Sequence, residues 1–575
     1  MKIFFRFFRQ YPKESILAPL FKLLEACFDL LVPLVVAVII DQGIGGGDRG
    51  LILRYVLVLV GLAVVGLTCA LCAQYFAAKA AVGTASRIRR ELFAHIQGFT
   101  YAQTDRMGTS TMITRLTSDV AQLQSGVNMT LRLFLRSPII IFGAWIMAAT
   151  ISPSLSGIFA ITIPLLAVVV FGVMLGGIPL FKRVQSRLDR VTAATRENLA
   201  GVRVIRAFCK EQEEISEFDA ANRQQTSLQN KAGLLTSLMN PVTYVLVNLA
   251  VILLLDRGAI SVNSGSITQG ELVALINYMG QILVELVKMA STIFLVTKAV
   301  ACSNRIGAVL DTPTGQAIIP AEGEADPAAP AVTFENVSLC YHEGSHPSLA
   351  DVSFSVPAGQ TVGIIGGTGS GKTTLVNLIP RFYDATTGRI LIHGQDVRSL
   401  DTAELRTRVG IVPQKAELFK GTIASNLKWG NPNATDTEMW QALTDAQAAD
   451  FVQEKEGQLS APVEQKGRNF SGGQKQRLTI ARALVGRPEI LILDDSASAL
   501  DFATDARLRS AIKGLDYHPT TFIISQRTSS IRHADLILVL EEGRVVGMGT
   551  HDDLLSSCDT YREIHLSQFK GGEAQ

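Results

Sequence analysis

The chain has 575 residues, which is too long for one ordinary hydrophobic core and predicts two or more domains. Hydrophobic residues make up 48% of the sequence and the mean hydropathy is +0.28, which is high for a soluble protein. The net charge is only +2, so no overall basic field favours nucleic acid as a partner. Cys69 and Cys72 have a redox-like spacing, but they lie in an apolar stretch and are expected to be small buried hydrophobic residues.

The first half of the chain contains apolar stretches long enough to cross a membrane. A helix needs about 20 mostly apolar residues for this. The sequence therefore predicts an α-helical transmembrane domain over residues 1–310, preceded at 1–9 by a basic, amphipathic segment that suits the inner membrane surface. The six predicted spans are roughly 16–40, 51–77, 131–151, 155–181, 234–255 and 272–296.

Basic residues indicate the orientation of these spans. Segment 79–136 contains eight Lys and Arg residues and segment 182–231 contains ten, whereas the connections on the other side contain two, none and one. By the positive-inside rule, the basic segments and both termini face the cytoplasm. We therefore expect a multi-pass protein of the cytoplasmic membrane of a prokaryote.

The two basic connections are unusually long, and apolar residues recur in them at helical spacing among charges. The membrane helices are therefore expected to continue past the bilayer into water. Midway between these helical arms lie two turns, 101–106 and 208–212. They are either plain loops or contact points for another domain, and their position between long arms favours contact points.

Several ionisable residues are expected at membrane depth: Glu25 and Asp29 in the first span, and Glu285 and Lys288 in the sixth. Charges at this depth face a bundle interior or a wet cavity. Two interpretations remain open. The residues form a polar wall of a substrate pathway, or they pair with Lys22 or Lys288 and hold helices together.

A linker rich in Pro, Ala and Gly, residues 311–330, precedes an expected α/β domain at 331–575. There, an apolar strand at 361–365 leads into a glycine-rich loop and a helix, which is the context of a phosphate-binding loop. Backbone N–H groups of such a loop wrap phosphates; Lys372 is expected to reach the β- and γ-phosphates, and Thr373 to bind Mg²⁺. The loop consists of Gly366, Gly367, Thr368, Gly369, Ser370, Gly371, Lys372 and Thr373.

A second apolar strand, 490–493, runs directly into Asp494 and Asp495. Four consecutive aliphatic residues argue against a solvated helix cap. Asp494 fits the carboxylate on the magnesium side of a nucleotide site, and Asp495 is then expected to face the water that attacks the γ-phosphate.

Between the loop and this strand, a Ser-Gly-Gly turn opens another helix. A glycine turn at a helix N-terminus is a second phosphate-binding device. The chain thus carries two half-sites for nucleotide, and if they cannot meet within one domain, each must be completed by a second domain. The turn consists of Ser471, Gly472 and Gly473, followed by Gln474.

With these motifs in order and at family-like spacing, the whole chain resembles the ATP-binding cassette (ABC) family, in the form of an exporter half-transporter with six membrane helices and one P-loop cassette. Residues 470–474 resemble the family signature, with Phe470 in place of the common Leu. Glu464 resembles the exporter residue that faces the coupling helices, and the turns at 101–106 and 208–212 look like those coupling helices.

The resemblance also implies residues that bind ATP and Mg²⁺. Tyr341 matches the aromatic residue that stacks on adenine, Gln414 the glutamine that touches Mg²⁺, and 498–501 the loop that crosses the dimer interface. The implied ATP-binding residues are Tyr341, Gly366 to Thr373, Thr374, Gln414, Ser471 to Gln474 and Asp501; those implied for Mg²⁺ are Thr373, Gln414 and Asp494.

Two positions depart from the family pattern: Asp495 stands where the family has Glu, and Gln526 where it has His. Asp is one methylene shorter, and a general base must lie within about 2.6–3.2 Å of its proton. Loss of one positioning group commonly costs a factor of about 10²–10⁴. Gln526 forms hydrogen bonds but carries no positive charge. Together the changes predict a site that binds ATP and seldom hydrolyses it; the other interpretation is an active, unusual ATPase.

This combination is similar to that of heterodimeric exporters with one degenerate site. It implies an ATP- and Mg²⁺-dependent transport ATPase that moves amphiphilic, drug- or lipid-like molecules through the lipid membrane out of the cytoplasm. A second, non-identical half-transporter would carry the Glu and the His, and this chain's signature would complete that partner's site. Alternatives are an ATP-gated regulatory or channel-like ABC protein and a homodimeric slow exporter. An importer is disfavoured, because importers of this family usually keep membrane and nucleotide domains on separate chains.

Overall fold

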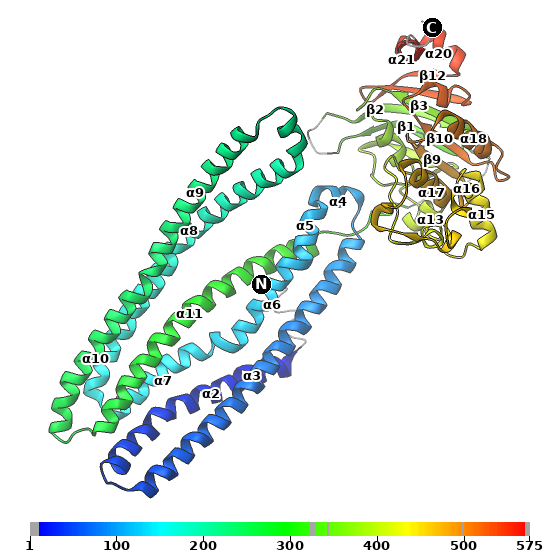
Figure 1. Ribbon diagram of the computed structural model, residues 1–575. Coiled ribbons are helices and arrows are strands. Elements are labelled where there is room, and N and C mark those ends of the chain that lie inside the picture. Colours follow the sequence, from blue (N-terminus) through cyan, green and yellow to red (C-terminus); the bar gives the residue numbers. More distant parts are fainter. Residues whose placement is uncertain are drawn as a thin grey trace. The chain divides into compact units, whose positions relative to one another are not determined.

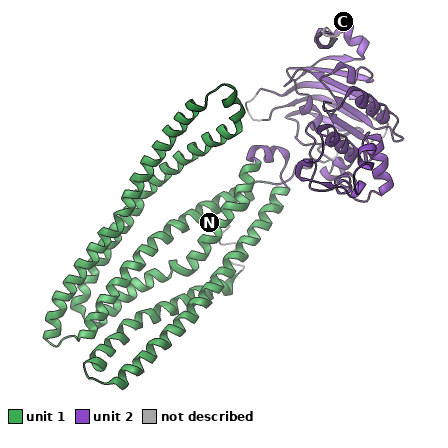
Figure 2. Cartoon of the chain, in the orientation of Figure 1, with its two compact units in different colours: residues 1–97, 109–313 green, residues 98–108, 314–575 purple. Residues whose placement is uncertain are grey.

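The computed structural model describes residues 11–320, 326, 328–341, 344, 346–496 and 498–569. The basic segment expected at 1–9 lies outside the described residues. The chain divides into two compact units, residues 1–97 with 109–313 and residues 98–108 with 314–575 (Figure 2). The short segment 98–108 thus belongs to the second unit, although both of its flanks in the chain belong to the first.

The first unit is a bundle of long helices (Figure 1). Among the described residues, six helical spans are long and apolar enough to cross a membrane, which confirms the number predicted from hydropathy. The spans are Pro12–Ile44, Arg49–Gln97, Thr109–Ile151, Pro153–Ala207, Glu211–Asn263 and Gln269–Leu310.

Three of these spans are composite and three are single helices. The third span breaks before Arg136, where Pro138 has no N–H to donate to the carbonyl four residues earlier. The elements are α2 (Pro12–Val38), π-helical η1 (Ile39–Ile44), α3 (Arg49–Gln97), α5 (Thr109–Thr114), π-helical η2 (Arg115–Asp119), α6 (Val120–Met129), π-helical η3 (Thr130–Phe134), α7 (Arg136–Ile151), α8 (Pro153–Ala207), α9 (Glu211–Ser237), α10 (Met239–Asn263) and α11 (Gln269–Leu310).

Helices α3 and α8 are much longer than a bilayer requires. They have 49 and 55 residues, which at about 1.5 Å per residue gives roughly 75–80 Å, against a hydrocarbon core of about 30 Å. Helix α8 packs along α9, which is polar and has a single buried residue, Ala232. These helices therefore have the extra length that the pattern of the basic connections predicts.

Acidic residues in two π-helical segments hold the sixth span. Asp41 in η1 accepts hydrogen bonds from Thr268 Oγ1 at 2.5 Å and from the Gly270 backbone at 2.7 Å, at the start of α11. Asp119 in η2 accepts two hydrogen bonds from the Arg305 guanidinium, at 2.5 and 3.0 Å, near the end of α11. Both ends of α11 are thereby fixed to the first and third spans.

The second unit is an α/β domain around a six-stranded sheet with the order β12-β11-β3-β10-β9-β6. All of its strands are parallel except β12, and its central strands are continuous apolar runs, as expected for a sheet covered on both faces. The strands are β3 (Thr361–Gly366), β6 (Val409–Val412), β9 (Ile490–Asp494), β10 (Thr520–Ile524), β11 (Leu536–Glu541) and β12 (Arg544–Gly549).

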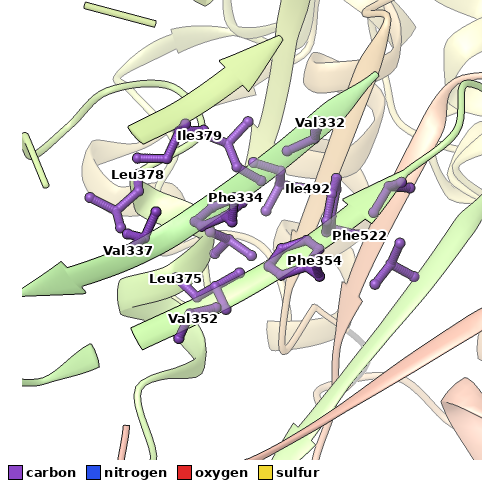
Figure 3. Close-up of a cluster of buried hydrophobic side chains, with 14 of the residues drawn as sticks. Val332, Phe334, Val337, Val352, Phe354, Leu375, Leu378, Ile379, Ile492 and Phe522 are labelled. Carbon is purple, nitrogen blue, oxygen red and sulfur yellow. The ribbon is translucent and has the colours of Figure 1, made fainter. Parts of the chain in front are cut away.

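An antiparallel sheet of order β2-β1-β4-β5 packs onto this sheet through a common core. Phe334 and Phe354 stack at 4.6 Å between ring centroids, and the core also contains Phe522 from the larger sheet and Leu375 from helix α12 (Lys372–Asn377) (Figure 3). This packing fixes helix α12, and the glycine loop leads directly into the start of that helix. The strands are β1 (Val332–Leu339), β2 (Leu349–Val356), β4 (Thr387–Ile392) and β5 (Gln395–Asp396).

A mostly helical part of the second unit has a separate core that includes Leu443, Leu478 and Leu500. The other elements of this unit are α4 (Tyr101–Met107), α13 (Thr402–Arg408), β7 (Gly421–Thr422), α14 (Ile423–Leu427), α15 (Asp436–Asp445), α16 (Ala449–Gln453), η4 (Gln458–Ser460), β8 (Pro462–Val463), η5 (Gln465–Gly467), α17 (Gly472–Leu484), α18 (Phe502–Lys513), α19 (Thr528–Ile531), α20 (His551–Ser557) and α21 (Asp559–Phe569).

Candidate functional site

The carboxyl ends of neighbouring parallel strands bring several predicted site residues to one edge of the six-stranded sheet. The register places Ile364, Ile524 and Asp494 side by side on β3, β10 and β9. The glycine loop follows β3, Asp495 follows β9 directly, and Gln526 lies two residues beyond β10. Segments far apart in the sequence therefore meet where ligands bind in open α/β sheets.

Gln414 reaches the same edge from β6, which pairs with β9 in parallel. Its Nε2 donates a hydrogen bond of 3.4 Å to Oδ2 of Asp495. The structure thus brings together the loop, Gln414, Asp494 and Asp495, which the resemblance assigns to one nucleotide site.

The glycine loop approaches neighbouring backbone so closely that two of its positions exclude side chains. Gly366 has φ +155° and Gly371 has φ +98°. A Cβ on Gly366 would lie 2.1 Å from the Leu540 carbonyl oxygen, and one on Gly371 would lie 2.7 Å from that of Ser348. The loop, which also contains Gly367, Thr368, Gly369 and Ser370, therefore depends on glycine at these positions.

Lys372 lies over this loop. Its Nζ donates hydrogen bonds to the carbonyl oxygens of Gly366 at 2.9 Å and Gly367 at 2.7 Å. Burial lowers the pKa of Lys372, and the nearby carboxylates of Asp495 and Asp494 act in the opposite direction. A cation beside a loop of backbone N–H groups is suited to phosphate.

Thr373 and Asp494 form an oxygen-donor pair beside the loop. Thr373 Oγ1 donates to Asp494 Oδ1 at 3.1 Å, and Asp494 is only 5% exposed. Burial raises the pKa of Asp494, with the charge of Asp495 adding to the shift and the Thr373 hydrogen bond opposing it. A hydroxyl and a carboxylate, with Gln414 nearby, are the hard oxygen ligands that Mg²⁺ prefers, so this donor set fits that ion.

The two departures from the family pattern lie on this edge. Asp495 has φ +46°, and its backbone N–H donates to the Ile524 carbonyl at 3.1 Å, which fixes it between two strand ends. Burial raises the pKa of its carboxyl, against smaller opposing effects of Gln414, Lys372 and Arg527. Gln526 is exposed, and its carbonyl accepts a hydrogen bond from Gln568 Nε2 at 2.7 Å.

The signature turn lies elsewhere in the domain, at the start of α17. Ser471 caps this helix, and it exchanges hydrogen bonds with Gln474: the Gln474 backbone donates to Ser471 Oγ at 3.3 Å, and the Ser471 backbone to Gln474 Oε1 at 3.0 Å. A Cβ on Gly473 would lie 3.1 Å from the Ala499 carbonyl oxygen, whereas one on Gly472 would meet nothing within 4 Å. The turn therefore backs onto segment 498–501 and presents Gly472 outward.

Asp501 closes that segment as the N-cap of α18, where it accepts hydrogen bonds from the Thr504 backbone and hydroxyl, both at 2.8 Å. Within the described residues, no hydrogen bond or ring contact joins 471–474 to the glycine loop. The two half-sites are thus not brought together within this domain.

Tyr341 lies beside the first turn of the loop helix. Its hydroxyl donates to Thr374 Oγ1 at 3.1 Å, and the residue is 42% exposed, so part of its ring is available. Its ring also meets that of Tyr383 edge-on, with centroids 5.0 Å apart. Sequence reasoning missed Tyr383; the adjacent aromatic residues Phe382 and Tyr383, a few residues after the loop helix, were the available signal.

Comparisons with known proteins agree with this geometry. The model of the ABC transporter transmembrane region matches residues 15–286, and the ABC transporter model matches residues 349–498. An uncharacterized ABC transporter ATP-binding protein of Mycobacterium tuberculosis is 37% identical over 565 residues, which cover 97% of each chain. The chain belongs to the ABC transporter family.

Two further relatives indicate the kind of ABC transporter. The ATP-dependent lipid A-core flippase of Salmonella typhimurium is 29% identical over 559 residues, 96% of this chain and 95% of the flippase. The solved structure of a bacterial Atm1-family ABC exporter with ATP bound matches with a TM-score of 0.81 and 25% identity, covering 98% of this chain and 99% of that one. This ABC transporter is therefore an exporter half-transporter and an ATP-driven transport ATPase, embedded in the membrane by six helices.

In the transmembrane domain of this ABC transporter, Arg136 contacts acidic residues from two other helices. Its guanidinium lies 2.6 Å from Asp29 and 3.9 Å from Glu25, both on α2, and 3.8 Å from Glu285 on α11. Sequence reasoning listed the acids but missed Arg136, because hydropathy placed it within the third span. Two Arg residues, Arg132 and Arg136, at the start of an otherwise apolar predicted span were the signal.

Lysines complete this group of charges. Lys22 lies 2.6 Å from Glu25, and Lys288 lies 3.1 Å from Glu285, which also accepts a hydrogen bond of 2.8 Å from Ser137. The interpretation as helix-holding pairs therefore has the required contacts. The side chains of Asp29 and Lys288 nevertheless stay 40% and 44% exposed, so the group also presents charge outside the packed core.

The two predicted contact turns, 101–106 and 208–212, differ in their contacts. The first forms α4, where Tyr101 stacks on Phe382 with ring centroids 4.1 Å apart and Asp105 accepts a hydrogen bond from Tyr383, so this turn contacts the cassette within its own unit. The second turn contains Phe208, which is 71% exposed.

Proposed function

We propose that this chain is the subunit of a heterodimeric ABC exporter that carries the degenerate nucleotide site. The supporting observation is the combination, on one sheet edge, of a complete phosphate loop with Asp495 and Gln526. The groups that bind phosphate and Mg²⁺ are present, whereas the two groups that act on the γ-phosphate are a shorter acid and an uncharged amide. Binding is thereby retained and hydrolysis weakened.

The geometry of the loop and the family resemblance support the proposed nucleotide contacts. Backbone N–H groups from Gly366 to Thr373, together with Thr374, would hold the phosphates of ATP, and Tyr341 would stack on the base. Thr373, Asp494 and Gln414 would hold Mg²⁺, which supplies positive charge to the phosphates when it is bound. Lys372 orients the β- and γ-phosphates.

The weak hydrolysis that we propose follows from reach and charge. The Asp495 carboxylate lies roughly one bond length closer to the backbone than a glutamate carboxylate, and the Asp495 backbone is hydrogen-bonded to the Ile524 carbonyl at the strand end. Gln526 offers an amide where a cation would stabilise charge on the transferring phosphate. One composite site of the dimer would therefore hold ATP and seldom cleave it.

The second half-site explains why a partner is needed. The Ser471 to Gln474 turn presents Gly472 away from its own domain. We propose that this turn closes the partner's competent nucleotide site, across the interface reached by segment 498–501. A homodimer would have two impaired sites, so the partner is expected to carry Glu and His at the matching positions.

Exposed aromatic residues suit further contacts between the two chains. Phe208 is 71% exposed, and the cassette carries a stacked pair, Phe419 and Trp429, with centroids 4.4 Å apart and 49% and 66% of each residue exposed. Aromatic residues are enriched where proteins meet. We propose that the Phe208 turn contacts the partner's cassette and that the Phe419–Trp429 pair receives the corresponding turn of the partner.

An amphiphilic substrate, drug- or lipid-like, fits the transmembrane domain. An apolar cavity of about 350 Å³ is lined by residues of α8, α9, α10 and α11, including Phe181, Met239 and Phe294. Val287 in its wall is adjacent in the chain to Lys288 of the charged group. A relative that is named a lipid A-core flippase acts on an amphiphile, which supports the same class here.

The topology of this exporter is also part of the proposal. Residues 1–310 form the transmembrane domain, 311–330 the linker and 331–575 the cassette. The many basic residues of segments 79–136 and 182–231 support a cytoplasmic location for the cassette and both termini, in the cytoplasmic membrane of a prokaryote.

The experiment is to purify the chain alone and together with its partner half-transporter and to measure Mg²⁺-dependent ATPase and ATP binding. We expect the isolated chain to bind ATP with almost no turnover, and the complex to hydrolyse ATP with stimulation by an amphiphile. Robust ATPase from the isolated chain would rule out the degenerate-site proposal. ATP-dependent uptake of the amphiphile into everted vesicles tests export, and an ATP-gated conductance without such uptake would contradict it.

A further inference from the structure

We infer that Tyr383 is a positioning residue that transmits the placement of the nucleotide base at Tyr341 to helix α4. The inference rests on the proposed stacking of adenine on Tyr341. Three side chains of the second unit form a continuous path: the Tyr341 ring contacts the Tyr383 ring, and the Tyr383 hydroxyl is bonded to Asp105 on α4.

The first link is between two aromatic rings. The planes of Tyr341 and Tyr383 are 88° apart and their centroids 5.0 Å, which is a favourable edge-to-face arrangement. The Tyr341 hydroxyl is anchored on Thr374 at 3.1 Å. With one end of Tyr341 fixed, a base stacked on its exposed face restricts the rotation of the ring, and the perpendicular Tyr383 ring is restricted with it.

The second link is a hydrogen bond. The Tyr383 hydroxyl donates to Oδ2 of Asp105 at 2.5 Å. Burial, together with Asp105, raises the pKa of Tyr383, so the hydroxyl remains a donor at neutral pH. A bond to a charged acceptor is about twice as strong as a neutral one, so Asp105 follows the Tyr383 ring.

Helix α4 is held so that its residues move together. Thr100 and Gln103 form a capping box, with the Gln103 backbone donating to Thr100 Oγ1 at 3.3 Å and the Thr100 backbone to Gln103 Oε1 at 2.9 Å. Tyr101 and Asp105 are four residues apart and share a face. On that face Tyr101 stacks on Phe382 at 4.1 Å, so two adjacent cassette residues hold one short helix at both ends.

The segment that carries Phe382 and Tyr383 is itself fixed to the cassette core. Arg381 is 2% exposed and bonds Asp384 at 2.6 Å. The Arg406 guanidinium lies 5.3 Å from the centroid of the Phe382 ring and donates to the Pro380 carbonyl at 3.2 Å. Because this segment is rigid, a restriction of the Tyr383 ring is passed to α4 rather than absorbed by its own backbone.

The path makes the response of α4 depend on the base as well as on the phosphates. ATP would occupy both the loop and Tyr341, whereas inorganic tripolyphosphate would occupy the loop alone. We therefore expect ATP, and not tripolyphosphate, to slow hydrogen exchange of the backbone amides of α4.

The test measures hydrogen exchange in the peptide containing 101–107 of the purified full-length chain, with Mg²⁺ and either ATP or tripolyphosphate, alongside the Kd for ATP. The variant Tyr383→Phe keeps the ring and removes the bond to Asp105. The matched control Tyr561→Phe removes the hydroxyl of a different, buried tyrosine of this unit, which contacts His551 Nδ1 at 2.6 Å.

In the wild type and in Tyr561→Phe, ATP is expected to slow exchange about fivefold, and tripolyphosphate less than about twofold. In Tyr383→Phe the Kd for ATP should stay within about twofold while the slowing by ATP is lost. The variant Asp105→Ala should lose the slowing by ATP to the same extent as Tyr383→Phe, and the double variant should lose no more of it than either single variant.

Full slowing by ATP in Tyr383→Phe, or equal slowing by tripolyphosphate, overturns the inference while the proposed nucleotide site stands. Absence of ATP binding in the wild type overturns the proposed function and this inference together.

Discussion

The side-chain amide of Gln414 lies 3.4 Å from the carboxylate of Asp495, longer than an ordinary N–H···O hydrogen bond of about 2.9–3.0 Å. The carboxylate of Asp495, directly after β9, therefore forms only a weak hydrogen bond with Gln414. A glutamate at this position would extend one methylene further from the strand, beyond the point where the Asp495 carboxylate ends.

The double substitution Asp495→Glu with Gln526→His is expected to raise ATP turnover at this site by about 10–100-fold. The longer acid reaches the attacking water, and the histidine supplies a partner for the γ-phosphate. The measurement is the ATPase rate of the heterodimer in which the partner's own catalytic glutamate is replaced by glutamine, so that this site alone turns over.

The control for this prediction is Asp495→Asn in the same heterodimer, which removes the base and should leave only the background rate. The single substitutions should each give part of the gain. If the double variant hydrolyses ATP no faster than the starting complex, groups other than residues 495 and 526 disable the site.

Asp494→Asn is expected to raise the thermal unfolding temperature of the cassette at pH 7.5 by about 2–4 °C, which corresponds to about 1 kcal/mol in a domain of this size. Burial raises the pKa of Asp494, so the folded state binds its proton more tightly than the unfolded state. The stability of the wild type therefore rises as pH falls through the raised pKa towards the ordinary value of about 4. The difference in unfolding temperature between Asp494→Asn and the wild type should therefore shrink as pH falls over this range. The measurement is unfolding followed by the fluorescence of Trp429 and Trp440.

The control Asp501→Asn is expected to change the unfolding temperature in the opposite direction. Hydrogen bonds from Thr504 lower the pKa of Asp501, so its contribution to stability is present above the ordinary pKa and is lost as pH falls through the lowered one. This variant should unfold at a lower temperature than the wild type at pH 7.5, and the difference should vanish in acid. A difference for Asp494→Asn that does not depend on pH would show that its charge is not the cause.

Much of this architecture was predictable from local sequence, because each feature repeats a simple physical pattern. Six apolar runs were long enough to cross a bilayer, and the strand 490–493 had to be buried on both faces. The glycine loop followed a strand and preceded a helix, which fixed its place at a sheet edge. Parallel pairing then brought Gln414 to Asp495 without any further signal in the sequence.

Contacts between distant segments were not predictable in the same way. Hydropathy places Arg136 within the predicted third span, and only packing against α2 and α11 shows that it contacts three acids. The turn at 101–106 was expected to contact some domain, but its partners Phe382 and Tyr383 depend on how the chain returns more than 270 residues later. Neither contact has a local pattern, because both are set by tertiary structure.

Arg136→Ala is expected to destabilise the transmembrane domain by about 3–5 kcal/mol, since it leaves Glu25, Asp29 and Glu285 with less positive charge in a poorly solvated place. The fluorescence of Trp145, on the same helix α7, follows unfolding in detergent of the purified chain in which Trp429 and Trp440 are replaced by Phe. Arg136→Lys should recover part of the loss.

The matched control for Arg136 is Arg257→Ala, because Arg257 lies 3.8 Å from Asp256 and both side chains are mostly exposed. It should unfold within about 1 °C of the wild type. An Arg136→Ala chain as stable as this control would mean that the charges do not hold the helices, and the interpretation as a polar wall of a substrate pathway would then account for them.

Gly472→Ala is expected to leave the stability of the isolated chain unchanged while lowering the ATPase rate of the heterodimer by about 10–100-fold. A Cβ at this position meets nothing within 4 Å of its own chain, so folding is unaffected. In the proposed dimer the same backbone lies against the nucleotide of the partner's site, where a signature glycine permits close approach and a methyl group does not.

The control Gly201→Ala, on α8, also places a Cβ where nothing lies within 4 Å. It should leave the ATPase rate unchanged, and it should not lower stability, because alanine favours a helix interior over glycine. If Gly472→Ala hydrolyses ATP at the wild-type rate in the heterodimer, the signature turn does not enter the partner's site. If it unfolds earlier than the wild type, the effect belongs to this chain rather than to the interface. A loss of ATPase alone has no cause within a chain whose residue 472 has open space around it, so it must come from a second chain and the nucleotide bound there.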